Sequence, residues 1–257
     1  MGEKLRIFVE RNLKLVNLIV LLVGILLMVI GLLLGKASPS VALVMVGVGS
    51  SVVASALVFY LSSFMLVRQL EVQDIVSEWG LVAVYRTRAE MNQKSNQYLG
   101  KAKGKLDIIA FGLRSLRDNM SSVIEERVKS GLSIRILTID PNSTVVSLRE
   151  IDEQQSDGSI KKTICDLASW VSQIRAHQAS GSQVEIRFYN ALPQDFYYRV
   201  DDHLFVGPYL FGKTSQQTIS YEFRSGSLGF DYWTEYFDSL WSNRNFSVIH
   251  EEFGKSA

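Results

Sequence analysis

The pattern of hydrophobic and polar positions divides this chain into two parts. Between Lys14 and Arg68, Lys36 is the only charged residue. The apolar stretches on either side of it, residues 15–35 and 41–67, both reach the ~20 residues needed to cross a hydrocarbon core about 30 Å thick. Lipid offers no hydrogen-bond partners to the backbone, so each stretch is predicted to be a helix. Residues 1–68 are therefore predicted to form a transmembrane hairpin.

The charges that flank the apolar stretches predict how the hairpin is oriented. Basic residues precede the first stretch and follow the second, whereas the turn carries Lys36 alone. Because positive residues are retained on the cytoplasmic side, the chain is predicted to lie in an inner or plasma membrane with both termini cytoplasmic. The first stretch is too long for a cleaved signal peptide, which makes it an uncleaved anchor.

Small residues recur at helical spacing inside the second stretch. Gly47, Ser51 and Ser55 lie four residues apart, and Gly24 and Gly31 lie in the first stretch. Small side chains let membrane helices approach closely. This pattern predicts packing within one hairpin or packing between the hairpins of a homo-oligomer.

The remainder of the chain shows helical and then alternating periodicity. Residues 69–99 are predicted to be a juxtamembrane helix, because Val72, Val76, Trp79 and Ala83 recur on one helical face. Residues 100–257 alternate strands and helices with short turns, which predicts a cytoplasmic α/β sandwich with a mixed sheet and helices on both sheet faces. Strands are expected at 106–111, 132–139, 184–189, 198–206 and 218–223, and helices at 116–129, 160–179 and 232–241.

Composition excludes several classes of function. The net charge is +1 and no block of basic residues is present, so no nucleic-acid partner is expected. Cys165 is the only cysteine and the three histidines are dispersed, so neither a disulfide nor a metal site is expected. Glycine-rich phosphate loops and nucleophile elbows are absent from the sequence, and no cofactor is expected.

Four short strings are similar to parts of a known family. They are Asp-Ile-Ile-Ala-Phe-Gly at 107–112, Lys-Ser-Gly-Leu-Ser-Ile-Arg-Ile-Leu-Thr-Ile-Asp-Pro at 129–141, Val-Glu-Ile-Arg-Phe-Tyr at 184–189 and Val-Asp-Asp-His-Leu-Phe-Val-Gly at 200–207. Together with the order of elements from 105 to 241, they resemble a single phospholipase D-like half domain. The resemblance implies an α/β sandwich and a catalytic signature of His-x-Lys followed by an acid.

The signature is degenerate in this chain. His203 matches the family's nucleophile, but Phe205 stands at the lysine position and Leu210 at the acid position. A phosphoryl transition state needs cationic stabilisation, which Phe205 does not supply. We therefore expect a pseudoenzyme in which His203 is catalytic only if activity is retained.

A ligand pocket is predicted beyond the strand ends, where ligands bind in open α/β folds. Arg114 is expected at a helix start suited to anions, and Tyr209 is expected to stack on a base. The predicted ligand-binding residues are Arg114, Asp140, Asn190, His203, Tyr209, Lys213, Ser215, Gln216, Gln217 and Thr218.

Three hypotheses follow for function. In the favoured one, the inactive phospholipase D-like domain senses a small phosphorylated or nucleotide ligand and signals to or through the hairpin, as in two-span effectors of bacterial defence. The first alternative is a membrane-bound phosphodiesterase or phosphatidyltransferase that acts on lipid as a homodimer. The second is a membrane-tethered interaction scaffold.

Overall fold

The computed structural model describes the backbone of residues 3–192 and 195–249. Within the chain, Met1–Val76 and Ser77–Ala257 are two compact units. The end of the predicted domain, 250–257, lies outside the described residues, as do the side chains of the basic residues before the first apolar stretch and of Arg68.

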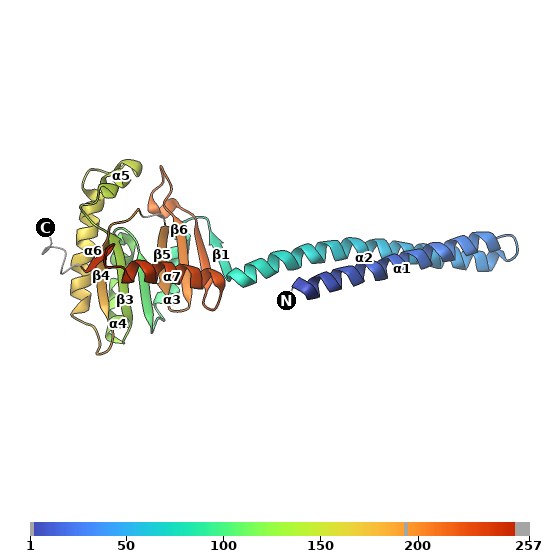
Figure 1. The fold of residues 1–257 in the computed structure, drawn as a ribbon, viewed down its shortest axis with the longest axis horizontal. Coiled ribbons are helices and arrows are strands. Elements are labelled where there is room, and N and C mark those ends of the chain that lie inside the picture. Colours follow the sequence, from blue (N-terminus) through green and yellow to red (C-terminus); the bar gives the residue numbers. More distant parts are fainter. Residues whose placement is uncertain (1–2, 193–194, 250–257) are drawn as a thin grey trace. The chain divides into compact units, whose positions relative to one another are not determined.

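Two helices make up the first unit, and the second helix ends within the second unit (Figure 1). They are α1 (Glu3–Leu34) and α2 (Pro39–Trp79). The segments Leu15–Leu34 and Pro39–Ser62 are long and apolar enough to cross a membrane, with mean hydropathies of 3.0 and 2.3. In the apolar stretch of 18 residues within each segment, only 11% and 17% is buried, respectively. The core helix of a soluble domain would be mostly buried.

Glycines mediate the contact between α1 and α2. A Cβ atom on Gly49 would lie 2.6 Å from Met28 Cγ, and one on Gly24 would lie 2.9 Å from Val53 Cγ2. A Cβ atom on Gly47 would meet nothing within 4 Å. The exposed Ser51 and Ser55 hydroxyls donate to backbone carbonyls of their own helix. The stripe of Gly47, Ser51 and Ser55 therefore lies outside the contact that Gly24 and Gly49 make within the hairpin.

The second unit contains an eight-stranded mixed sheet in the order β1-β7-β6-β5-β2-β3-β4-β8. Strands β2, β3 and β4 are parallel, and the other neighbours are antiparallel. The strands are β1 (Leu81–Tyr85), β2 (Lys105–Ile109), β3 (Ser133–Ile139), β4 (Val184–Tyr189), β5 (Asp195–Val200), β6 (His203–Pro208), β7 (Ser220–Arg224) and β8 (Ser247–Ile249).

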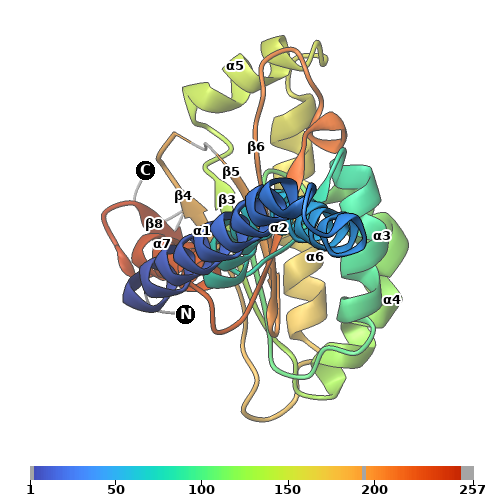
Figure 2. The same cartoon turned by 90° about the vertical axis from the view of Figure 1, so that its right-hand side faces the viewer.

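Helices cover both faces of the sheet (Figure 2), which confirms the predicted mixed α/β class. Tyr197 of β5 stacks on Phe237 of α7, with ring centroids 5.0 Å apart, whereas the next residue, Tyr198, lines a groove together with residues of α3 and α4. The helices are α3 (Arg88–Leu99), α4 (Arg114–Lys129), α5 (Thr144–Asp152), α6 (Ser159–Arg175) and α7 (Leu228–Ser242), with a short 3-10 helix η1 (Ser215–Gln217).

The prediction of one juxtamembrane helix over 69–99 is wrong, because β1 separates the end of α2 from α3. Gly80 adopts a left-handed conformation with φ +65°, which ends α2. The following Leu-Val-Ala-Val-Tyr is β1, which pairs with β7. The sheet therefore recruits residues that lie before the predicted domain start at 100, because alternation and β-branched side chains favour a strand where helical spacing had suggested a helix.

The single strand predicted at 198–206 is also wrong. Asp201 and Asp202 form the two-residue turn of a hairpin that joins β5 to β6, and Asp201 has a φ of +47°. Its carboxylate accepts hydrogen bonds from the backbone N–H groups of Lys103, Gly104 and Lys105, at 2.8–2.9 Å. Aspartate tolerates this conformation better than most residues, and the three amides hold the turn against the start of β2.

We predict that Gly49→Ala destabilises the full-length protein in detergent, whereas Gly47→Ala does not. The first change forces a methyl group into the contact with Met28, and overpacking of this kind typically costs about 1–3 kcal/mol. The second places a methyl group in open space. Thermal unfolding of the two variants beside wild type measures the difference. Equal effects of the two alanines would contradict the helix contact described here.

Candidate functional site

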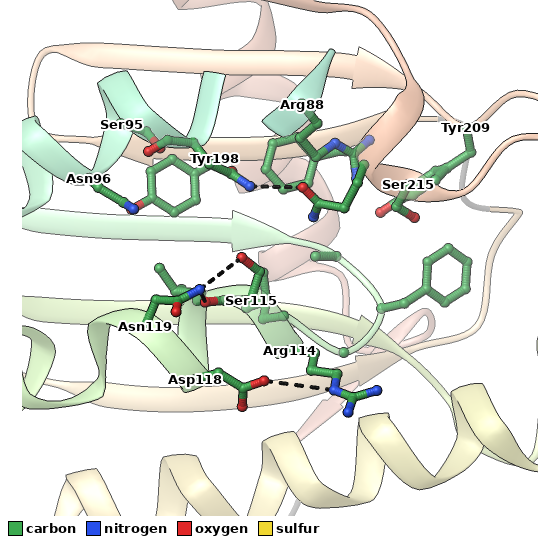
Figure 3. Close-up of a pocket in the computed structure, with 18 residues that line it drawn as sticks. Arg88, Ser95, Asn96, Arg114, Ser115, Asp118, Asn119, Tyr198, Tyr209 and Ser215 are labelled. Carbon is green, nitrogen blue, oxygen red and sulfur yellow. Dashed lines mark hydrogen bonds and ion pairs between the residues drawn. The ribbon is translucent and has the colours of Figure 1, made fainter. Parts of the chain in front are cut away.

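A groove of about 440 Å³ lies between α3 and α4, over β5 (Figure 3). It opens at the edge where β2 has its carboxyl end. Because β5, β6, β7 and β1 succeed one another antiparallel, β1 and β6 end at this same edge and β7 begins there. The groove thus lies beyond the carboxyl end of β2, the end of the strands at which open α/β sheets bind ligands.

Arg88 is the buried cation of this groove. It begins α3, after Thr87 caps the helix by accepting from the Glu90 amide. The residue is only 4% exposed, and its guanidinium carbon lies 4.0 Å from the centroid of the Phe196 ring. Nη2 donates to Thr218 Oγ1 at 3.3 Å, while Nε has no hydrogen-bond partner. Burial lowers the pKa of this guanidinium, because apolar surroundings disfavour its charge.

The partly buried Arg135 and the buried Arg149 differ from Arg88 in having carboxylate partners. Arg135 makes a two-pronged ion pair with Asp107, at 2.7 and 2.8 Å, beneath α7. Arg149 is ion-paired with Asp152 and with Glu153. Within the described residues no carboxylate lies at ion-pair distance from Arg88. A buried charge without a partner is costly, so this position is suited to an anion that binds from outside.

The amino terminus of α4 supplies a second feature that favours anions. Its first-turn residues line the groove, and no side chain caps it, because Leu113 occupies the cap position in a left-handed conformation with φ +48°. The starts of the other domain helices are satisfied by Thr87, Ser143, Ser227 and, for α6, the Glu150 carboxylate. Free amides at a helix start and the helix dipole both favour a negative group.

Uncharged polar groups line the part of the groove away from Arg88. Asn96 and Ser95 come from α3, Asn119 comes from α4 and Tyr198 forms the floor. The Tyr198 hydroxyl is buried without a hydrogen-bond partner. Asn92 donates to the Gln216 side chain at 3.0 Å, which joins α3 to η1 along the rim.

The lining of the groove is rich in hydrogen-bonding side chains. Its lining contains no histidine, cysteine, lysine or glutamate, and its aspartate, Asp118, is paired with Arg114 at 3.7 Å. A nucleophile beside a general base is therefore not present among the lining residues. Across the described residues, no cluster of three or more His, Cys, Asp or Glu side chains is placed to hold a metal ion.

The structure brings together some of the residues that the sequence nominated. Arg114, Tyr209, Ser215 and Gln216 line the groove, and Thr218 supports Arg88 from behind. The ring of Tyr209 already packs against two guanidiniums, those of Arg88 at 5.1 Å and Arg149 at 5.2 Å.

Six of the ten nominated residues do not line this groove: Thr218, His203 and four others. Of these four, the side chains of Asp140, Asn190 and Gln217 bond to Asn142, Ser143 and Thr214, respectively, while the Lys213 carbonyl accepts from Arg149. They follow strand ends or belong to the same loop, but the helix arrangement directs them elsewhere.

His203 lies at the end of the strands opposite to the groove. It begins β6, roughly 17 Å along that strand from Pro208, because the Asp201–Asp202 turn reverses the chain. Its Nδ1 lies 3.0 Å from Glu222 Oε1, and its ring stacks on Tyr98 with centroids 3.6 Å apart. The expectation that His203 joins Arg114 in one pocket is therefore wrong.

The predicted site omitted Arg88, Asn96 and Tyr198. A signal for Arg88 exists in the sequence, since Thr87-Arg-Ala-Glu90 is a capping pattern that marks a helix start. Treating 69–99 as one helix concealed it. For Asn96 and Tyr198 we find no such signal, because their proximity depends on how α3 packs over β5.

Two solved structures are reported as similar to this chain. TrmBL2, an archaeal chromatin protein with a novel mode of DNA binding, matches 78% of this chain and 67% of its own, with 14% identity and a TM-score of 0.41. Phosphatidylserine synthase from Haemophilus influenzae matches 65% of this chain, with 11% identity and a TM-score of 0.43. This chain spans only 38% of that synthase. No curated protein matches the sequence.

One family model covers most of the α/β domain. It matches residues 79–246, which begin at the last residue of α2 and end just before β8, so it includes all the residues of the groove. The chain therefore belongs to the family described as domain of unknown function (DUF5919).

Proposed function

We propose that this chain is a membrane-anchored binding protein whose α/β domain holds a small phosphate-bearing molecule in the groove between α3 and α4. The observation that carries the proposal is the buried guanidinium of Arg88, which faces the uncapped start of α4 without a carboxylate partner. A phosphate accepts hydrogen bonds from a guanidinium and from helix amides at once.

The two apolar helices provide the anchor. In this proposal Leu15–Leu34 and Pro39–Ser62 cross the membrane, and both termini lie in the cytoplasm. The exposed stripe of Gly47, Ser51 and Ser55 is available to contact a second copy of the chain.

Continuity of the chain supports signalling between ligand and hairpin. Only β1 and its flanking turns separate Trp79, the last residue of α2, from Arg88. A ligand that binds Arg88 therefore contacts a residue that is joined to the second apolar helix through β1 and its flanking turns. This architecture of two apolar helices before a binding domain is also what motivates an effector role in bacterial defence.

The phosphodiesterase alternative rests on His203 and its Glu222 partner. Against it, Phe205 is fully buried at the position where the catalytic lysine would stand, close to the rings of Tyr85, Tyr98 and Tyr198. The place of the phosphate-binding cation is thus part of the hydrophobic core.

We predict that Arg88→Gln weakens the binding of inorganic phosphate by about tenfold to a hundredfold, because it removes a charged hydrogen-bond donor. Equilibrium dialysis with radiolabelled phosphate on the full-length protein in detergent measures this. Lys129→Gln, which removes the same charge from the far end of α4, should bind as wild type does. If a folded Arg88→Gln protein bound phosphate normally, the proposed site would be wrong.

For catalysis, we expect that Phe205→Lys creates no phosphodiesterase activity and instead unfolds the domain at a lower temperature. The change replaces a core ring by a cation, and loss of such a ring alone costs about 3–5 kcal/mol. Phe205→Leu should cost less. Cleavage of a chromogenic phosphodiester by wild type, and its loss in His203→Ala, would favour the alternative enzyme over a binding protein.

Cys165 offers a direct test of membrane orientation, because it is the chain's only cysteine and is exposed on α6. A membrane-impermeant maleimide should label it in inside-out vesicles and not in right-side-out vesicles. In a Cys165→Ser background, Ala37→Cys in the turn between α1 and α2 should show the reverse pattern. Labelling of both positions from the same side would exclude a two-span hairpin.

A further inference from the structure

The groove is longer than one phosphate requires. Arg88 and Asn96 both line it from α3, and eight residues of helix separate their Cα atoms by about 12 Å along the axis. The volume of about 440 Å³ lies within the range of ~300–1,000 Å³ that is typical of sites for whole organic ligands. The phosphate would therefore occupy one end and leave the other end to a different part of the same molecule.

The chemistry of the far end differs from that of the Arg88 end. Asn96 and Asn119 present carboxamides, and Tyr198 presents a hydroxyl. The Asn96 side chain makes no hydrogen bond within the described residues, and the buried Tyr198 hydroxyl is unpartnered. A carboxamide donates and accepts at once, which matches the paired donor and acceptor atoms on the edge of a nucleobase.

A carboxylate lies close to this wall. Asp118 of α4 lines the groove between the helix start and Asn119. Acidic side chains accept hydrogen bonds from ribose hydroxyls in nucleotide sites. Along the groove the order of groups is thus cation and helix amides, then carboxylate, then carboxamides and phenol.

We infer that the ligand is a nucleoside monophosphate, with its phosphate at Arg88 and the start of α4 and its base against Asn96 and Tyr198. This inference rests on the proposed phosphate site and adds the nucleoside to it. The groove has room for one such molecule. Asn96 is the specificity-determining residue, because it contacts the base and not the phosphate.

Calorimetric titration of the full-length protein in nanodiscs tests the assignment. The probes are the four ribonucleoside 5′-monophosphates, ribose 5-phosphate, inorganic phosphate and adenosine. At least one nucleotide should bind about tenfold more tightly than ribose 5-phosphate, the gain that base recognition by a paired amide provides. Arg88→Gln should weaken nucleotide and ribose 5-phosphate to the same extent.

Variants at the far end separate base recognition from phosphate binding. Asn96→Ala should remove most of the preference for nucleotide over ribose 5-phosphate while leaving inorganic phosphate unchanged, and the exposed Asn245→Ala serves as its control. Tyr198→Phe removes a hydroxyl that has no partner in the free protein, so it should leave the unfolding temperature unchanged or raised and weaken nucleotide binding severalfold.

The outcomes distinguish this inference from the proposed function. Equal affinity for ribose 5-phosphate and for every nucleotide would overturn the nucleoside assignment in favour of a sugar phosphate and would leave the phosphate site standing. Unchanged nucleotide affinity in Asn96→Ala would also overturn it. Failure of every phosphorylated probe to bind would overturn both.

Discussion

The antiparallel pairing of β5 with β2 is the constraint on which the rest of the domain depends. It turns a three-stranded parallel sheet into a mixed one, and it is held at one end by the Asp201 carboxylate, which accepts from three consecutive backbone amides before and within β2. From this pairing it follows that β1 and β6 end at the carboxyl edge of β2. Segments far apart in the sequence therefore meet at the groove, and His203 is left at the opposite edge.

Charge is distributed unequally between the two faces of the sheet. On the α7 face, Arg135 is paired with Asp107 and Asp238, and the aromatic rings of α7 cover the pair. On the opposite face, Arg88 is 4% exposed, donates to the Thr218 hydroxyl and packs against aromatic rings, and no carboxylate of the described residues lies at ion-pair distance from it. Natural domains seldom leave a buried cation without a counter-ion unless a ligand supplies one. The same face also carries the uncapped start of α4. For this reason the functional proposal is based on the groove and not on the pair of His203 and Glu222.

The hairpin shows a similar division between satisfied and available surfaces. Gly24, Gly31 and Gly49 bring α1 and α2 together, because any larger side chain there would collide with the facing helix. Gly47 has open space in front of it. The face of α2 that contacts α1 is thus different from the face that carries the exposed small residues. In the proposed function, packing within the hairpin and contact between copies therefore depend on separate residues.

The sequence by itself determined the two apolar helices and the mixed α/β class, because these depend on composition and periodicity. It also nominated Arg114, Tyr209, Ser215 and Gln216, since residues that follow strand ends or precede strands gather at one edge. Only the tertiary structure decided that Arg88 is the buried cation, that Asn96 and Tyr198 share its groove, and that His203 does not. These placements depend on the strand order, on the end of α2 at Gly80 and on the reversal of the chain at Asp201. Gly80 and Asp201 are single left-handed residues whose effect extends far beyond any local pattern.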